Sequence, residues 1–275
     1  MDAVTTSSTR PTRPGRPALL RLCGRLGRGA FRFLGDAGRM TLFLKSTVGA
    51  IFHRPFRPLE LVSQLEFIGA RSVGVVVLSA IFTGLVLALQ GYNVLVRFGS
   101  QNLVGSLVTL SLTRELAPVL AALMVTARAG SAMAAVIGNM AVSEQLDALK
   151  SLAINPVQYL AVPRLLATVI ALPILTAGFS VAGIGAAYLF SVTVLGLDGL
   201  AFMSNVRSSV EWSDVSIGLW KAVIFGVLIA WIGTFRGFQT RGGARGVGRA
   251  TSRTVVQSAV LILCGDYVMT ALFSI

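Results

Sequence analysis

The stretch that decides the fold runs from Ser111 to Leu149: S-L-T-R-E-L-A-P-V-L-A-A-L-M-V-T-A-R-A-G-S-A-M-A-A-V-I-G-N-M-A-V-S-E-Q-L-D-A-L. It begins with a charged pair, Arg114-Glu115, inside apolar sequence, and continues through a run rich in Ala and Gly. It ends in a short amphipathic segment, Ser143 to Leu149. A charge pair at membrane depth, a closely packing helix and a segment suited to contact a partner predict a membrane protein that another subunit drives.

The composition around this stretch places the whole chain in the membrane. Hydrophobic residues make up 54% and charged residues only 13%, outside the range of soluble domains. Ser72 to Val96 carries no charge in 25 residues, and Leu165 to Leu197 carries none in 33. Because a spanning helix needs about 20 apolar residues, the sequence predicts an all-α polytopic membrane protein.

The net charge of +13 does not indicate nucleic-acid binding, because of where the charge lies. Eleven of the 24 basic residues precede position 58, and five more crowd residues 236–253. Basic residues concentrate in cytoplasmic segments of membrane proteins. Both regions are therefore predicted to be cytoplasmic.

Three parts of the chain are expected. Residues 1–17 are polar, basic and proline-rich, which predicts a disordered cytoplasmic tail. Residues 18–71 are predicted to form interfacial amphipathic helices, because Arg21, Arg25, Arg28 and Arg32 recur on one helical face; a merely solvated basic segment is the alternative. Residues 72–275 form the predicted five-span membrane domain.

Five spans are predicted at residues 72–96, 103–138, 164–195, 215–235 and 254–274. An inner loop over 140–163, an external segment over 198–214 and a basic inner loop over 236–253 connect them. Pro118 is expected to open the second span locally. The amino terminus is then cytoplasmic and the carboxyl terminus periplasmic.

Four charges interrupt the spans: Arg114, Glu115, Lys221 and Asp266. Each costs about 2.5–3.5 kcal/mol at the centre of a lipid-facing helix, so they must face protein or a cavity. Counted along the helices they lie at similar depths, which predicts one buried cluster linking spans two, four and five. It is either a static clamp or a latch that rearranges during transport. Arg128 is separate and is expected to pair with the inner loop.

Two further sets of residues are candidates for function. The segment with Ser143, Glu144, Gln145, Leu146, Asp147 and Leu149 is predicted to form a short helix, with Ser143 as its cap. Leu87, Val94, Leu95 and Phe98 follow one helical stripe. Ordinary helix packing explains such a stripe, and a lipid-lined cavity is the more specific hypothesis.

Several classes of site are excluded or disfavoured. The chain contains no G-x-x-x-x-G-K-[ST], so it has no phosphate-binding loop of its own. His53 is the only histidine, which argues against a histidine-based metal site or a catalytic triad. The glycine-rich segment 242–248 follows no strand and is expected to be a flexible basic turn. We therefore predict no metal, no cofactor and no catalytic residue in this chain.

Specific motifs resemble one known family. They are L-A-L-Q-G-Y (87–92), L-T-R-E-L-A-P-V (112–119), A-R-A-G-S-A (127–132), S-E-Q-L-D-A-L (143–149), I-N-P-V-Q-Y-L-A-V-P-R (154–164), L-W-K-A-V-I-F-G (219–226) and G-V-G-R-A-T-S-R-T-V-V (246–256). Together they resemble the MlaE/YrbE (Ttg2B-like) permeases of MCE-type phospholipid ABC transporters, over about residues 55–275.

The resemblance implies a homodimer in the inner membrane of a diderm bacterium, with phospholipid as cargo and a role in outer-membrane lipid asymmetry. It also implies an MlaF-like ATPase that binds ATP and Mg, an MlaB-like STAS protein and an MlaD-like MCE hexamer. Residues 143–149 would match the coupling helix seated in the ATPase. One departure is Val136, where many members have Glu.

Two other functions remain as alternatives. A membrane-embedded lipid-modifying enzyme would need a nucleophile or metal set, which the chain does not offer. A proton-coupled lipid carrier would use Glu115 and Asp266 as a relay, but five spans without an internal repeat are unlike such carriers.

Overall fold

The computed structural model describes residues 18–51 and 58–273, with side chains described from residue 34 onward. The tail expected at residues 1–17 lies outside these ranges. Within them every regular element is a helix, which confirms the predicted fold class. The first helix, α1, runs over Ala18–Ile51. It crosses the boundary between two separately compact parts of the chain, and all packing described below lies in the part from Leu44 onward.

Five helical stretches of the described chain are long and apolar enough to cross a membrane. They are Pro58–Phe98, Gln101–Val142, Val157–Thr193, Trp212–Phe238 and Gly243–Phe273. Their number and order agree with the five predicted spans, so the chain is a multi-pass helical membrane protein. All five exceed the roughly 20 residues that cross the apolar core.

The stretches divide into elements as follows. The first consists of α2 (Pro58–Ile68) and α3 (Val73–Leu95), and the second contains α4 (Val104–Ser111), α5 (Ala117–Val125) and α6 (Ser131–Val142). The short helix α7 (Gln145–Ser151) follows α6. The remaining spans are α8 (Val162–Thr193, preceded by a turn over Val157–Ala161), α10 (Trp212–Phe238) and α11 (Gly243–Phe273), with α9 (Gly199–Ser209) between α8 and α10.

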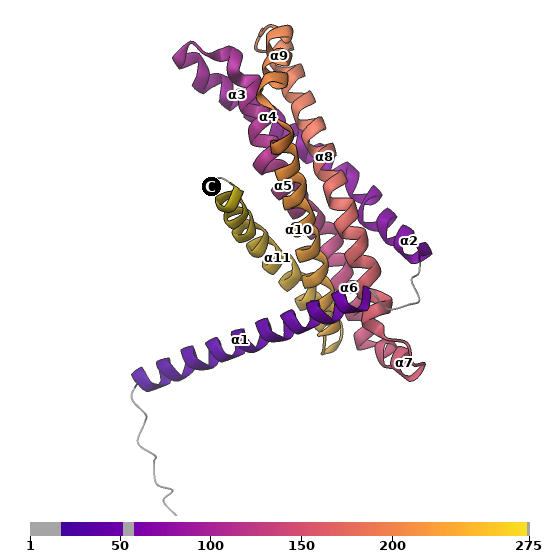
Figure 1. The fold of residues 1–275 in the computed structure, drawn as a ribbon. Helices are drawn as coiled ribbons and strands as arrows, with labels where there is room; N and C mark the ends of the chain where they lie inside the picture. Colours follow the sequence, from indigo (N-terminus) through magenta and orange to yellow (C-terminus); the bar gives the residue numbers. More distant parts are fainter. Residues whose placement is uncertain (1–17, 52–57, 274–275) are drawn as a thin grey trace, which may run out of the picture. The chain divides into compact units, whose positions relative to one another are not determined.

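The third span, α8, is central to the bundle. It packs against α3 on one side and α10 on another, while α11 packs against α10 and α6 (Figure 1). At the α3–α8 crossing, a Cβ added to Gly84 would collide with the backbone carbonyl of Gly183. Small residues permit two backbones to approach this closely. The resulting close packing stabilises the helix contact in lipid, where no hydrophobic effect drives helices together.

Two π-helical turns interrupt the second span. They cover Leu112–Leu116 and Thr126–Gly130, and each holds one arginine, Arg114 or Arg128. Pro118 follows the first turn, at the start of α5, and has no N–H to donate. The predicted local opening of this span is therefore present. Single π turns inside α-helices are frequent at functional sites.

The predicted basic loop over 236–253 is wrong for most of its length. The fourth span continues to Phe238 and α11 begins at Gly243, so residues 239–242 alone join them. Gly242 (φ 87°) and Gly243 (φ 65°) adopt the left-handed conformation that this tight turn requires. The arginines beyond it recur every four residues and share one helical face, so charge did not break the helix. The inner loop is likewise shorter than predicted, since α6 reaches Val142 and the third span starts at Val157.

Candidate functional site

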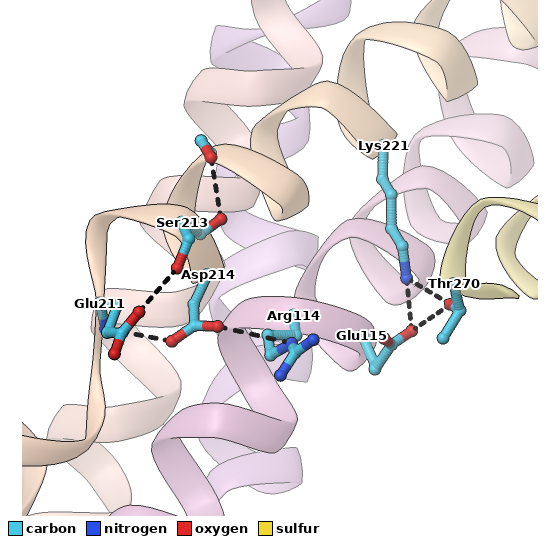
Figure 2. A network of polar contacts seen from close by, with 8 residues as sticks. Arg114, Glu115, Glu211, Ser213, Asp214, Lys221 and Thr270 are labelled. Carbon is cyan, nitrogen blue, oxygen red and sulfur yellow. Dashed lines mark hydrogen bonds and ion pairs between the residues drawn. The ribbon is translucent and has the colours of Figure 1, made fainter. Parts of the chain in front are cut away.

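Lys221 lies at the centre of a charged cluster inside the bundle. Its side chain is fully buried on α10. Its ammonium donates to Glu115 Oε2 at 2.5 Å and to Thr270 Oγ1 at 2.8 Å, and lies 2.9 Å from Asp266 Oδ1. Figure 2 shows the first two contacts. The contacts with Glu115 and Thr270 are hydrogen bonds, and the contact with Asp266 is an ion pair.

Each oxygen comes from a different place in the fold. The first π turn carries Glu115 in the second span, and α11 carries Asp266 and Thr270 one helical turn apart. The Thr270 hydroxyl also lies 3.1 Å from Glu115 Oε2. The structure thus brings Glu115, Lys221 and Asp266 together and joins spans two, four and five through them.

Arg114 lies outside this cluster, which differs from the prediction of one network of four. Its Nε lies 3.5 Å from Asp214 Oδ1 at the start of the fourth span (Figure 2). Neighbouring residues on a helix point about 100° apart, so Arg114 and Glu115 face different partners. The π turn in which both lie does not bring them onto one face.

Asp214 is the residue that sequence reasoning missed, because it was assigned to the external segment. Its carboxylate accepts from the backbone N–H of Glu211 at 3.0 Å, and the two residues form a reciprocal capping box at the start of α10. The acidic residues three apart in E-W-S-D were the available signal. With Asp214 included, the ion-paired charges at this level of the bundle are two cations and three carboxylates, where four charges summing to zero were predicted.

Arg128 is also placed differently from the prediction that it pairs with the inner loop. Its Nη1 donates to the Phe67 carbonyl at 2.9 Å and to Ser72 Oγ at 2.9 Å. The guanidinium lies over the Phe67 ring, 5.6 Å from its centroid. Arg128 therefore ties the second π turn to the break between α2 and α3.

The predicted partner-contacting segment forms α7, which packs on α6. The predicted Ser143 cap is wrong: the Ser143 hydroxyl donates to the Asn139 carbonyl at 2.9 Å, because α6 extends to this point. Glu144 precedes the helix in the left-handed conformation (φ 60°). Leu146 is buried, whereas Asp147 is exposed and pairs with Lys150 at 2.7 Å. Glu144 and Gln145 are exposed, and Leu149 is half-buried.

The four residues of the predicted lipid stripe lie at the end of α3 and just beyond it. Val94 and Phe98 are exposed, at 52% and 74%. Leu87 and Leu95 are half-buried against the apolar core. Val136 is exposed on α6. In the part of the chain that the structure describes, no three His, Cys, Asp or Glu side chains are grouped to hold a metal ion.

Five apolar spans around a charge cluster, with a short helix beyond their ends, are typical of membrane-embedded transport proteins. Ionisable side chains between spans are costly and mark such proteins. A family model described as Permease MlaE matches residues 61–272, so the chain belongs to the MlaE permease family.

Relatives agree with this family over most of the chain. A probable ABC transporter permease protein of Rickettsia felis is 40% identical over 255 residues, which are 93% of this chain and 98% of that protein. The intermembrane phospholipid transport system permease protein MlaE of Haemophilus influenzae is 41% identical over 243 residues, 88% of this chain and 92% of that protein. The chloroplastic protein TRIGALACTOSYLDIACYLGLYCEROL 1 of Arabidopsis thaliana is 36% identical over 212 residues, 77% of this chain and 61% of that protein.

Proposed function

We propose that this chain is the permease subunit of an ATP-binding-cassette transporter that moves phospholipid between the inner membrane and the periplasm or outer membrane. The observation that carries the proposal is the match to the permease family over residues 61–272. Support comes from the name of the Haemophilus relative, a phospholipid transport permease. The chain has no phosphate-binding loop, so ATP and Mg belong to a separate ATPase subunit.

The docking element for that ATPase is α7. It is short, lies beyond the ends of the spans, and presents the exposed carboxylates of Glu144 and Asp147. Leu146 anchors it to the rest of the chain, so force on α7 passes directly into α6. The complete transporter contains two copies of this chain, an MlaF-like ATPase, an MlaB-like protein and an MlaD-like MCE hexamer.

The cargo contacts the end of α3. Val94 and Phe98 leave large apolar side chains uncovered there, and acyl chains of phospholipid have the matching chemistry. The α7 end of the bundle faces the cytoplasm and the α9 end faces the periplasm. The basic residues around the turn between α10 and α11 lie at the end opposite α9, and basic residues concentrate on the cytoplasmic side.

Native mass spectrometry of the complex, extracted from its own membrane with the full chain as bait, tests the function. We expect a mass that contains two copies of this chain, an ATPase and phospholipid. A chain purified without any ATPase would overturn the proposal and favour the lipid-modifying enzyme or the proton-coupled carrier.

Photo-crosslinking tests the cargo site. A photoreactive residue at position 98 should capture phospholipid much more than one at Leu189, which is 62% exposed on α8 and serves as the control. Equal capture at the two positions would mean that position 98 samples only the surrounding bilayer.

A further inference from the structure

A cavity of about 370 Å³ lies between α4, α8, α9 and α10, and its lining includes no residue of the Lys221 cluster and none of α3. Its floor is formed by Thr109 of α4 and Thr113 of the first π turn. The side walls include Thr176 and Ser180 of α8 and Gly218 of α10, and α9 contributes Arg207. The volume is near the lower end of the roughly 300–1,000 Å³ range of small-molecule sites.

The wall formed by α9 is held in place by direct bonds. Asn205 Nδ2 donates to the Asn102 carbonyl at 2.8 Å, and the Ser209 hydroxyl donates to Ser106 Oγ at 2.5 Å. Phe202 is buried and packs edge-on against Tyr188, with ring centroids 5.6 Å apart. The cavity is therefore preformed and does not depend on a ligand to order it.

Most of the lining is apolar in character. The hydroxyls of Thr109 and Ser180 donate to carbonyls of their own helices, so their polar groups are satisfied. Thr176 is 3% exposed, and its Oγ1 has no hydrogen-bond partner among the described residues. Because the Thr176 hydroxyl is itself buried, the accessible lining is chiefly apolar, which fits a hydrocarbon chain.

The cavity opens toward lipid and next to a positive charge. Val181 on its rim is 73% exposed on α8, on a helix that spans the membrane. Arg207 is exposed, and no ion pair neutralises it within the described ranges. A guanidinium binds phosphate oxygens through paired N–H donors.

We propose that this cavity is a binding site for one acyl chain of an anionic phospholipid from the periplasmic leaflet, with the lipid phosphate at Arg207. The site is separate from the cargo site at α3. It rests on the proposed function only in that the α9 end of the bundle faces the periplasm. Lipid held here packs against the π turn that carries Arg114 and Glu115, through Thr113.

A helix of a partner protein is a poorer occupant. An α-helix with its side chains is about 10–12 Å wide, and it needs a groove open along several turns. This cavity is closed on one side by α9 and on another by α10. Its small volume accepts a chain and excludes a helix.

The experiment uses the full complex in nanodiscs of phosphatidylcholine with a minority of phosphatidylglycerol. A photoreactive residue replaces Ala177, which lines the cavity, or Ile174, which is 67% exposed on the same helix outside it. Mass spectrometry of the adducts gives the ratio of the two lipids. We expect phosphatidylglycerol to be enriched about fivefold over the bulk ratio at position 177, the effect of one charge near the membrane surface, and not at position 174.

Arg207→Gln should bring the ratio at position 177 back to that of the bulk, while Arg207→Lys should retain most of the enrichment. Enrichment that survives Arg207→Gln would overturn the assignment of the phosphate. Bulk composition at both positions would mean annular lipid only, and adducts with a polypeptide would mean a protein partner; either result overturns the site. None of these crosslinking measurements requires ATP hydrolysis. A negative result for the lipid site is therefore distinguishable from a negative result for the proposed transport function.

Discussion

Replacing Lys221 with Met tests whether the charged cluster behaves as one unit. The substitution keeps an unbranched apolar stem, one heavy atom shorter, but removes the ammonium that Glu115 and Asp266 share. The two carboxylate oxygens lie at most about 5.4 Å apart, the two contact lengths added together. Two like charges at that distance repel by about 3 kcal/mol at an effective dielectric constant near 20.

The expected loss of stability is therefore about 3–5 kcal/mol, as for other broken buried pairs. The carboxylate side chains are 37% and 21% exposed, so solvent screening favours the lower value. Asp266→Asn alone should cost less, about 1–3 kcal/mol, because Lys221 keeps Glu115 and Thr270. The double variant should be more stable than Lys221→Met alone, because one of the two repelling charges is gone.

Thermal melting of the complex in nanodiscs measures these differences. A loss of 3–5 kcal/mol corresponds to about 6–20 °C for a domain of this size. Strictly additive losses in the double-mutant cycle would show that Lys221 and Asp266 do not interact, and would refute the reasoning. Lipid transfer by the double variant then separates two roles. A static clamp predicts lower stability with near-normal transfer, and a latch predicts ATP hydrolysis without transfer.

Two further predictions concern packing and coupling. Gly84→Ala should destabilise the chain by about 1–3 kcal/mol in the same melting assay, because the added Cβ meets the α8 backbone. Gly74→Ala on the same helix is the control. An added Cβ there has nothing within 4 Å, so this variant should be neutral or slightly stabilising. Equal shifts for the two variants would contradict the close α3–α8 approach. Lys at both Glu144 and Asp147 should leave melting within about 1 kcal/mol, since these groups are exposed, and should abolish lipid-stimulated ATP hydrolysis. Wild-type hydrolysis in this variant would mean that α7 is not the docking element.

The spans and the charge cluster could be predicted because lipid imposes strict rules. A charge inside a span must find a partner, and Arg114, Glu115, Lys221 and Asp266 were the charges available at similar depth, of which the last three meet. Counting residues along straight helices was sufficient to place these three together. The same counting also located the five spans, since their apolar length is what the bilayer selects.

The partners of the two arginines could not be predicted, for a physical reason. Arg114 and Arg128 each lie in a π turn, and a π turn changes the direction in which later side chains point. Asp214 and Phe67 are about 100 and 61 residues away from them, so no local pattern connects each pair. The loop after α10 was misassigned because charge was taken to end a helix, although arginines four apart extend one.

The two π turns also have a consequence for tolerance to insertion and deletion. A π turn is equivalent to one additional residue in an α-helix, and one residue corresponds to about 100° of rotation. Deleting a single residue inside either π turn, Leu112–Leu116 or Thr126–Gly130, would therefore convert it to an ordinary α turn and keep the orientation of the rest of the second span, whereas a deletion that no π turn absorbs would rotate everything after it. The two π turns are therefore the places in this span where homologous chains are expected to differ by one residue in length.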